Sequence, residues 1–436
     1  MSANEAKGWY RNSATLKVLG IAVLALLLLI PASMVMNLVR ERENEFNTVA
    51  IEIGQKWGFP QTMTGPIITI PYVVQYLDSD GKMRSTRHNA HFLPETLNIS
   101  SNVNPELRYR GIYSVIVYSS KIKISGTFPK PDFSSWKIEN GDILWNEAYI
   151  EFGVSDMRGI KNQAKISLNN IEYEVNPGCS KEIFETGISC ILPSTSNKID
   201  FALNLDLNGS NQLYFTPIGK TTNVTCESNW NNPSFDGAFL PDKRDVNEKG
   251  FTASWSILHL NRSYPQQWTD SNYQVSESQF GVKLLLPVDH YQKSMRSAKY
   301  AIMFIGLTFL AFFFIEILNR KKIHPIQYLL VGAALCIFYT LLLSLSEHIG
   351  FLWAYILAAI AIISLISTYT YSILSNMRLV AITSGILVVL YLYLFTILQL
   401  QDYALLMGSV GLFVVLAIVM YISRKINWYG DQADNV

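Results

Sequence analysis

The sequence places an acid directly beside a histidine at two points, and these four side chains are the best suited to proton transfer. Glu347 and His348 are adjacent, and Asp289 immediately precedes His290. A carboxylate beside an imidazole, whose pKa is near neutrality, can form a proton relay. For Glu347 and His348, the alternative that we favour is that both face water and lipid headgroups at the loop. For Asp289 and His290, we favour an interfacial turn that leads into the second span over a ligand role for His290. Convergence of all four on one cleft would instead indicate an enzyme.

The recognised motifs for catalysis or metal binding are absent from the sequence. It contains no Gly-x-Ser-x-Gly, His-Glu-x-x-His or Cys-x-x-Cys motif and no glycine-rich phosphate loop. His88 and His91 lie three residues apart on an expected strand, which puts them on opposite faces and argues against a shared metal. We therefore predict no catalytic residue, no metal ligand and no cofactor.

Four cysteines are too few for a fold built on disulfides. Cys179 and Cys190 are close enough in sequence to close a small loop, and such a bridge would add about 2–3 kcal/mol. With Cys226 in the same polar region, three single pairings are possible, and the pair 179–190 is the one we favour. The alternative is three unpaired, buried thiols. Cys336 lies in an apolar run.

Six apolar stretches have the ~20 residues that a helix needs to cross a bilayer. Cleavage of the first stretch as a signal peptide is a weaker alternative, because the stretch is long and rich in leucine. The six are Val18–Met36, Tyr300–Leu318, Ile326–Leu345, Gly350–Thr370, Leu379–Leu398 and Tyr403–Tyr421.

The lysines and arginines beside these stretches predict the orientation of the chain. With six spans and the N-terminus inside, all of them fall on one side of the membrane, which the positive-inside rule assigns to the cytoplasm. The cations are Lys7, Arg11, Lys17, Arg320, Lys321, Lys322, Arg378, Arg424 and Lys425. The two short loops on the opposite side, Ser346–Ile349 and Gln399–Asp402, contain no lysine or arginine. We expect both termini in the cytoplasm and the long polar segment outside.

Ionisable residues inside a bilayer are costly and are functional suspects by default. Besides Glu347 and His348, only Glu316 qualifies, and it stands four residues before Arg320, as in a helical ion pair. Small residues at close to helical spacing, from Gly350 through Ala354 and Ala358, are explained by close packing of helices. These few acids do not outline an ion pathway.

The long polar segment reads as short alternating strands separated by turn residues, after a short helix over Arg42–Trp57. Three pairs of strands flank turn sequences typical of hairpins. The turns are Asp78–Gly81, Asn169-Asn170 and Asn208–Asn211, and Tyr113–Phe128 adds a clean two-residue alternation. We predict an all-β domain resembling an antiparallel sandwich. The net charge of +1 gives no basic stripe, so nucleic acid is not an expected partner.

Several runs, in order along most of the chain, resemble one protein family, the CreD-like inner-membrane proteins of Gram-negative bacteria. The runs are Trp57-Gly58, Gly65–Tyr72, Arg110–Tyr113, Val117-Tyr118, Ser228–Trp230, Pro233–Gly237, Phe251–Trp255, Pro287–Gln292, Arg296–Tyr300, His324–Gly332 and Leu343–Gly350. The resemblance implies a role in cell-envelope integrity and in the envelope-stress and β-lactam response under a two-component regulator. It also implies altered colicin tolerance on overproduction. The family offers no agreed catalytic residues, so no residue here inherits a role.

The resemblance and the charge pattern together predict five segments. They are a cytoplasmic N-terminus (1–17), a first transmembrane helix (18–38), a periplasmic β-rich domain (39–297), a five-helix transmembrane bundle (298–423) and a cytoplasmic tail (424–436). The fold class is thus a six-helix membrane bundle with a large β-rich periplasmic domain.

Three functions compete at this point. The first, which we favour, is a non-enzymatic protein whose outer domain binds an envelope protein or a cell-wall component, with membrane lipids around its helices. The second is a transporter or lipid-handling protein, which predicts paired polar residues near mid-membrane. The third is an envelope enzyme, which requires distant residues to converge. The sequence leaves the oligomeric state open.

Overall fold

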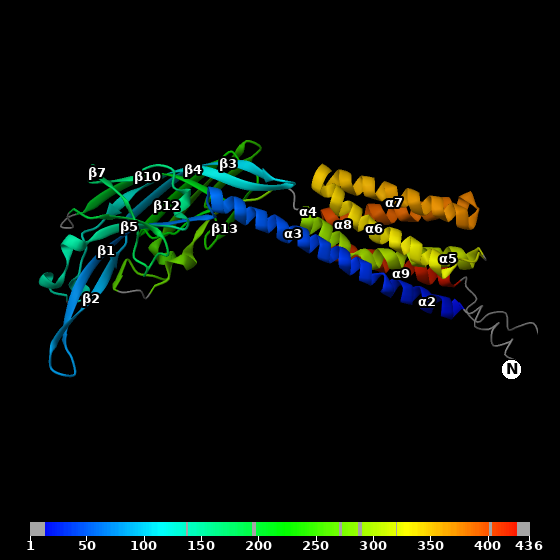
Figure 1. Cartoon of the computed structure of the whole chain (residues 1–436), viewed down its shortest axis with the longest axis horizontal. Helices are drawn as coiled ribbons and strands as arrows, with labels where there is room; N and C mark the ends of the chain where they lie inside the picture. The colour runs from blue at the N-terminus through cyan, green and yellow to red at the C-terminus, as the bar shows by residue number, and fades with distance from the viewer. Residues whose placement is uncertain are drawn as a thin grey trace, which may run out of the picture. The chain divides into compact units, whose positions relative to one another are not determined.

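The structure is a computed structural model, and it describes residues 14–136, 138–193, 198–269, 273–286, 290–319, 321–400 and 403–424. The chain divides into two compact units, Met1–Phe46 with Val288–Val436, and Asn47–Pro287. The first unit is helical and the second is rich in β-strands (Figure 1). The predicted fold class, a set of membrane helices with a β-rich domain, is confirmed.

Within the described residues, six helices are long and apolar enough to cross a membrane, so each predicted span is a helix. The first is formed by α2 (Ala14–Leu27) with α3 (Leu29–Trp57). The others are α5 (Ala301–Leu318), α6 (Pro325–Ile349), α7 (Phe351–Leu374), α8 (Met377–Gln399) and α9 (Ala404–Ser423). Before α5 comes the short helix α4 (His290–Lys299), whose cations Lys293, Arg296 and Lys299 make it polar on one side.

The first membrane helix is interrupted once, at Leu28. Pro31 has no amide hydrogen to donate to the carbonyl of Leu27, four residues back, which explains the break between α2 and α3. The amides of Leu28 and Ala32 still donate to carbonyls four residues earlier, at 3.1 and 3.2 Å. The helical path therefore continues through the break. α3 also confirms the helix expected over Arg42–Trp57, which is the continuation of the first span rather than a separate helix.

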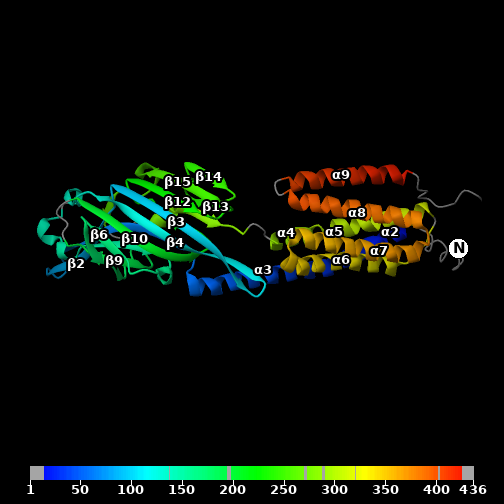
Figure 2. The ribbon, with the colours of Figure 1, turned by 90° about the horizontal axis from the view of Figure 1, so that it is seen from above.

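The spans α6, α7 and α8 lie side by side (Figure 2). They pack through small and aromatic side chains. Ala354 and Ala358 of α7 are fully buried, as the small-residue spacing predicts. The Tyr355 hydroxyl of α7 donates to the carbonyl of Tyr391 in α8 at 2.7 Å. Gly350 alone joins α6 to α7, with φ = 80°, a left-handed conformation that suits glycine. The expected loop over Ser346–Ile349 is therefore wrong, because these residues form the last turn of α6.

The β-rich unit is built from two sheets. The first has nine strands and runs β13-β17-β11-β1-β5-β9-β8, with β2 paired to β1 and β16 paired to β2. Its strands are β1 (Gln61–Leu77), β2 (Met83–Phe92), β5 (Tyr149–Val154), β8 (Asn176–Pro177), β9 (Gly187–Ile191), β11 (Gln212–Phe215), β13 (Pro233–Gly237), β16 (Gln267–Thr269) and β17 (Phe280–Leu284). β1 and β2 continue together into a long hairpin that projects from the rest of the unit (Figure 1).

The second sheet has eight strands in the order β14-β15-β12-β3-β4-β10-β6-β7. These are β3 (Thr96–Arg110), β4 (Tyr113–Phe128), β6 (Lys165–Leu168), β7 (Ile171–Glu174), β10 (Ile199–Ser210), β12 (Thr221–Ser228), β14 (Lys243–Asn247) and β15 (Gly250–Leu258). Short 3-10 helices connect the strands at Ser134–Trp136, Asn140–Asp142, Trp145–Glu147, Met157–Gly159, His259–Asn261 and Val275–Ser278. One hydrophobic core joins the two sheets, with Phe128, Phe152 and Trp255 among its largest fully buried side chains.

Two of the three predicted hairpins are confirmed. Leu77 pairs with Met83 across Asp78–Gly81, and Leu168 pairs with Ile171 across Asn169-Asn170, both of which have positive φ. The third prediction is wrong, because β10 and β11 belong to different sheets. Asn211, with φ = 60°, lies between them where the chain passes from one sheet to the other. The alternation of polar and apolar residues marks strands but does not say which sheet they join.

Candidate functional site

Glu347 and His348 have different surroundings in the last turn of α6. The Glu347 side chain is largely buried; its Oε1 lies 3.9 Å from Nε of Arg42 and accepts a hydrogen bond from the Tyr291 hydroxyl at 3.4 Å. His348 is exposed. Glu347 is thus a partnered acid of the helical unit. The proton relay between Glu347 and His348 stays a prediction, and this geometry gives it little support.

The second acid–histidine pair cannot be placed in the same way. Asp289 lies outside the described residues, and of His290 the structure describes the backbone, which begins α4. The convergence of all four residues on one cleft therefore stays untested.

Glu316 is buried near the end of α5 and is neutralised by contacts from other helices. Lys17 Nζ donates to its Oε1 at 2.7 Å, and the Tyr328 hydroxyl donates to its Oε2 at 2.9 Å. The amide of Ile323 donates to Oε1 at 3.2 Å. The expected partner, Arg320, lies outside the described residues. A buried carboxylate with a cation and two further donors is a structural tie between α2, α5 and α6.

All four cysteines are free thiols, so the favoured bond between Cys179 and Cys190 is not formed. The ladder of β8 and β9 explains why. The amide of Gly178 donates to the carbonyl of Gly187, so these two residues lie opposite each other. Cys179 lies one residue beyond this pair in one direction, and Cys190 lies three residues beyond it in the other direction. At about 3.3 Å per residue the two cysteines are roughly 13 Å apart along the ladder, beyond the ~7 Å that a disulfide can span.

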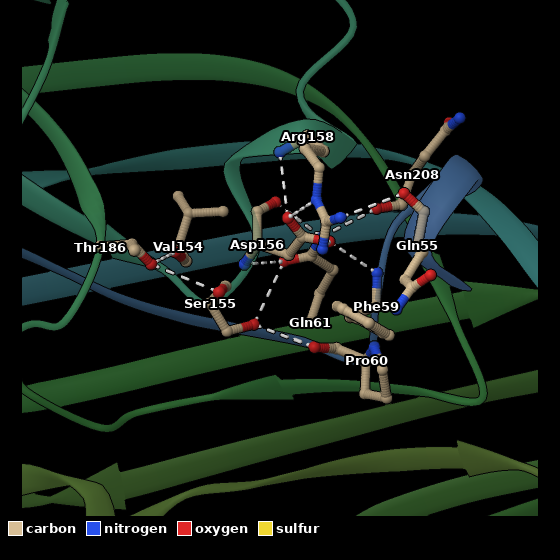
Figure 3. A network of polar contacts seen from close by, with 10 residues as sticks. All are labelled: Gln55, Phe59, Pro60, Gln61, Val154, Ser155, Asp156, Arg158, Thr186 and Asn208. Atoms are coloured by element: carbon tan, nitrogen blue, oxygen red, sulfur yellow. Dashed lines mark hydrogen bonds and ion pairs between the residues drawn. The ribbon is translucent and has the colours of Figure 1, made fainter. Parts of the chain in front are cut away.

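A buried polar network joins the end of α3 to the sheets of the β-rich unit (Figure 3). Gln61 is fully buried, and its Nε2 donates to the carbonyls of Asp156 and Asn208, both at 3.0 Å. Its Oε1 accepts from the amide of Asp156 and the hydroxyl of Ser155, both at 3.2 Å. This one amide satisfies backbone groups from two other segments, so its role is to hold them in place.

Asp156 completes the network. Its Oδ2 accepts from the amide of Phe59 at 2.9 Å, and its Oδ1 accepts from Nε of Arg158 at 2.9 Å (Figure 3). Burial alone would raise the pKa of Asp156, but the hydrogen bonds from Arg158 and Phe59 outweigh burial and hold the pKa below its ordinary value. Asp156 therefore stays ionised and anchors the chain at the point where α3 gives way to β1.

A second buried cluster has the residue types of a catalytic site. Thr69 Oγ1 lies 2.9 Å from Nδ1 of His91 and 2.7 Å from Oε1 of Glu151. His91 Nε2 lies 3.2 Å from Oε2 of Glu182. The amide of Ser180 donates to the other oxygen of Glu151 at 2.7 Å. Hydroxyl, imidazole and carboxylate thus stand in a row, as in a nucleophile–base–acid triad.

The pattern of hydrogen bonds around Thr69 and His91 indicates an extra proton in this cluster. The Thr69 hydroxyl has one hydrogen and two partners, Glu151 and His91. If Thr69 donates to Glu151, both nitrogens of His91 must carry protons, one for Thr69 and one for Glu182. If Glu151 is protonated and donates to Thr69, then Thr69 donates to Nδ1, and one proton on Nε2 is enough. Both arrangements hold one proton more than a neutral imidazole with two carboxylates.

The cluster is closed to a substrate. Thr69, His91 and Glu151 are each 0% exposed, and burial raises the pKa of the Glu151 carboxyl to about 7. The sequence reasoning missed this cluster, although one signal was available, since Glu151 is an acid within the buried strand β5. His88 instead stacks on Tyr72 with ring centroids 5.5 Å apart, which agrees with the expected opposite faces of β2.

An open, polar hollow of about 420 Å³ lies at the end of the eight-stranded sheet. Its walls come from β3, β12, the turn between β14 and β15, and the start of β15. It is lined by Asn102, Val103, Asn104, Glu227, Ser228, Asn229, Asn247, Lys249, Gly250, Phe251 and Thr252. Amides, hydroxyls and one charge of each sign face this space, and it contains neither a histidine nor a cysteine. Such a lining can hydrogen-bond a polar ligand but offers no general base near neutrality.

Comparison with known proteins identifies the family of the chain. The family described as Inner membrane protein CreD matches residues 13–429. The chain belongs to this family. The Inner membrane protein CreD of Escherichia coli strain K12 is 36% identical over 414 residues, covering 93% of this chain and 91% of that protein.

Several of the runs that carry the CreD resemblance lie at the end of α3, in the buried cluster and at the hollow. Trp57 closes α3, and its ring faces the guanidinium of Arg108 at 4.7 Å. The run Gly65–Tyr72 contributes Thr69 to the buried cluster. The runs 228–230 and 251–255 supply four residues of the hollow's lining: Ser228, Asn229, Phe251 and Thr252. The resemblance thus rests on residues of the β-rich unit as well as on the membrane spans.

Proposed function

We propose that this CreD-family chain is a non-enzymatic envelope protein that binds a partner or an envelope component through its β-rich unit. The observation that carries the proposal is the open hollow of the eight-stranded sheet, lined by amides and hydroxyls. Binding there supports cell-envelope integrity under stress, including stress from β-lactams. The helices serve as the membrane anchor.

The distribution of charge supports a periplasmic position for this unit. Lysines and arginines beside the six spans fall on one side, whereas the long segment 39–297 joins the first and second spans on the other. Both termini then lie in the cytoplasm. In this orientation the hollow faces the periplasm, where envelope components are found.

Burial argues against an enzyme. Among the described residues, the cluster with the types suited to catalysis is the one around Thr69, His91 and Glu151, and those three side chains are inaccessible to solvent. The accessible hollow has the opposite character, since it is open and lacks a nucleophile paired with a base. Binding without turnover fits both observations.

Transport receives less support from the helical unit. Glu316 and Glu347 are each paired with a cation near a helix end rather than near mid-span. A mostly apolar groove of about 660 Å³ between α3 and α6, lined in part by Met34, Leu38 and Ile337, suits the acyl chains of surrounding lipids. Replacing Glu347 and His348 by glutamine should leave the envelope phenotype intact. Loss of function at normal abundance would favour a transporter.

Crosslinking in intact envelopes tests the proposal. A photo-reactive amino acid at position 104 or 252, both on the hollow, should capture a specific envelope component in living cells. The matched control is position 176, an exposed asparagine on β8 of the other sheet. Equal or absent capture at all three positions would contradict binding at the hollow.

A further inference from the structure

The outward face of the eight-stranded sheet carries short polar side chains in register across its strands. Alternate residues of β3, β4, β12 and β15 point away from the core, and in the central part of the sheet every one of them is an amide, a hydroxyl or a charged group. They are Asn98, Ser100, Asn102 and Asn104; Ser119, Lys121, Lys123 and Ser125; Asn223, Thr225 and Glu227; and Thr252, Ser254 and Ser256. We call this set the amide face.

Hydrogen bonds between neighbouring strands orient the amides. The Ser256 hydroxyl donates to Oδ1 of Asn223 at 2.9 Å, and Nδ2 of Asn223 donates to Oδ1 of Asn98 at 3.0 Å. Nδ2 of Asn229 donates to Oδ1 of Asn104 at 3.2 Å. An amide has two N–H groups and an acceptor oxygen, so each of these contacts leaves further donors and acceptors directed to solvent.

The register gives these groups a regular spacing. Ser256, Asn223, Asn98 and Ser125 lie directly opposite one another on four consecutive strands, β15, β12, β3 and β4. Neighbouring strands are about 4.8 Å apart, close to the length of one sugar ring in an extended chain. Thr252, Glu227, Asn102 and Lys121 form a parallel row that ends in the hollow.

The two lysines of the amide face are balanced by Glu227 on the same face and by Asp206 on the neighbouring strand β10. Lys121 and Lys123 of β4 stand opposite Asp206 and Asn204 of β10, and Glu227 lies one strand beyond Asn102. Such a mixture does not attract a polyanion such as nucleic acid, which requires a surface of one sign. It suits a neutral ligand that bonds through many donors and acceptors.

We propose that the amide face and the hollow bind a neutral, β-linked glycan chain that carries acetamido groups. Sugar hydroxyls donate and accept in turn, as asparagine and serine do, and an acetamido group pairs with an asparagine amide through one donor and one acceptor. The ligand's chain lies across the strands, and the hollow between Asn104, Glu227 and Thr252 receives one of its rings. Short side chains already held by neighbours lose little entropy on binding.

The inference deepens the proposed function, because it names the class of ligand that the hollow takes. A protein partner is the competing occupant of the same face. The two occupants can be told apart with a purified probe. If the ligand is a glycan, a glycan oligomer binds the purified full-length chain with no other protein present.

The test uses the full chain in lipid nanodiscs and the β-1,4-linked hexamer of N-acetylglucosamine, with binding measured by calorimetry. We expect saturable binding that falls about tenfold in the Asn102→Leu and Asn104→Leu variants, because each loses hydrogen bonds to the ligand. The matched control, Asn176→Leu, should bind as the unmodified chain does. All three positions are exposed, so the substitutions leave the core intact.

Two results would overturn the inference. One is no saturable binding of the hexamer, or equal binding by all variants. The other is equal affinity for the corresponding glucose hexamer, which lacks acetamido groups and should bind more weakly. If the hexamer fails while crosslinks from position 104 capture a protein, the glycan is wrong and the proposed function stands. If both fail, neither stands.

Discussion

At the scale of single residues, burial of the Glu151 carboxyl has the clearest consequence, because it raises the pKa of that group to about 7. Glu151 is fully buried, accepts from Ser180 and lies beside Thr69 and His91. Its surroundings include Glu182 and Tyr149, and burial raises the pKa of Tyr149 to about 12. Burial is the largest influence on this carboxyl and the charge of Glu182 adds to it, so the carboxyl keeps its proton up to about neutrality.

This proton makes stability depend on pH. The pKa of Glu151 is about 7 in the folded chain and near 4.5 when exposed, so the folded state binds the extra proton between these values. The contribution is therefore complete below pH 4.5 and is lost as the pH rises through 7. We expect the unmodified chain to lose about 3 kcal/mol of stability over that range, at roughly 1.4 kcal/mol per pH unit.

The Glu151→Gln variant should remove most of this slope, since an amide cannot release a proton. Thermal unfolding of the full chain followed by tryptophan fluorescence at several pH values measures it. The matched control is Glu185→Gln, because Glu185 is exposed and close in sequence. A slope that is the same in both variants would show that Glu151 does not hold the proton.

At the scale of elements, the β-rich unit depends on side chains that tie one element to the next. Gln61 at the start of β1 bonds to Ser155 and Asp156 after β5 and to Asn208 in β10. Nearby, Nε1 of Trp57 at the end of α3 donates to the carbonyl of Tyr118 in β4 at 3.1 Å. These ties fix where the helix ends and the sheets begin.

Replacing Gln61 by leucine should destabilise the unit by about 3 kcal/mol or more. Leucine fills the same space but removes the donor that Nε2 supplies to the carbonyls of Asp156 and Asn208, and it removes the acceptor of the Asp156 amide, at roughly 1–3 kcal/mol for each group left unpaired. Urea unfolding of the full chain measures the loss. The same change at Gln75, exposed on the same strand, should be nearly neutral. Equal effects at both positions would contradict the role given to Gln61.

Elements with local signals were predictable from the sequence, and long-range arrangements were not. Residues that lie close together in the chain were enough to predict the spans, the hairpins at 78–81 and 169–170, and β4. The crossing from β10 to β11 and the parallel pairing of β1 with β11 depend on packing between distant segments. The cluster around Thr69 was missed for the same reason, because β1, β2 and β5 bring its members together.

At the scale of the whole molecule, the lysines and arginines beside the spans predict an orientation in the membrane. An Asn98→Cys variant should react with a membrane-impermeant maleimide added to cells with a permeabilised outer membrane, since the amide face would be periplasmic. Met377→Cys, exposed at the first residue of α8, should react only after the inner membrane is opened. A background with serine at the native cysteines keeps the labelling specific. The reverse pattern would invert the topology.

The central claim is that the hollow of the β-rich unit performs the protein's task in the envelope. The most direct measurement is complementation of a strain lacking this chain, scored by envelope integrity under a β-lactam at matched protein abundance. Asn104→Trp and Thr252→Trp fill the hollow from its rim and should abolish rescue, whereas Asn176→Trp on the other sheet should rescue fully. Full rescue by the two hollow variants would contradict the account.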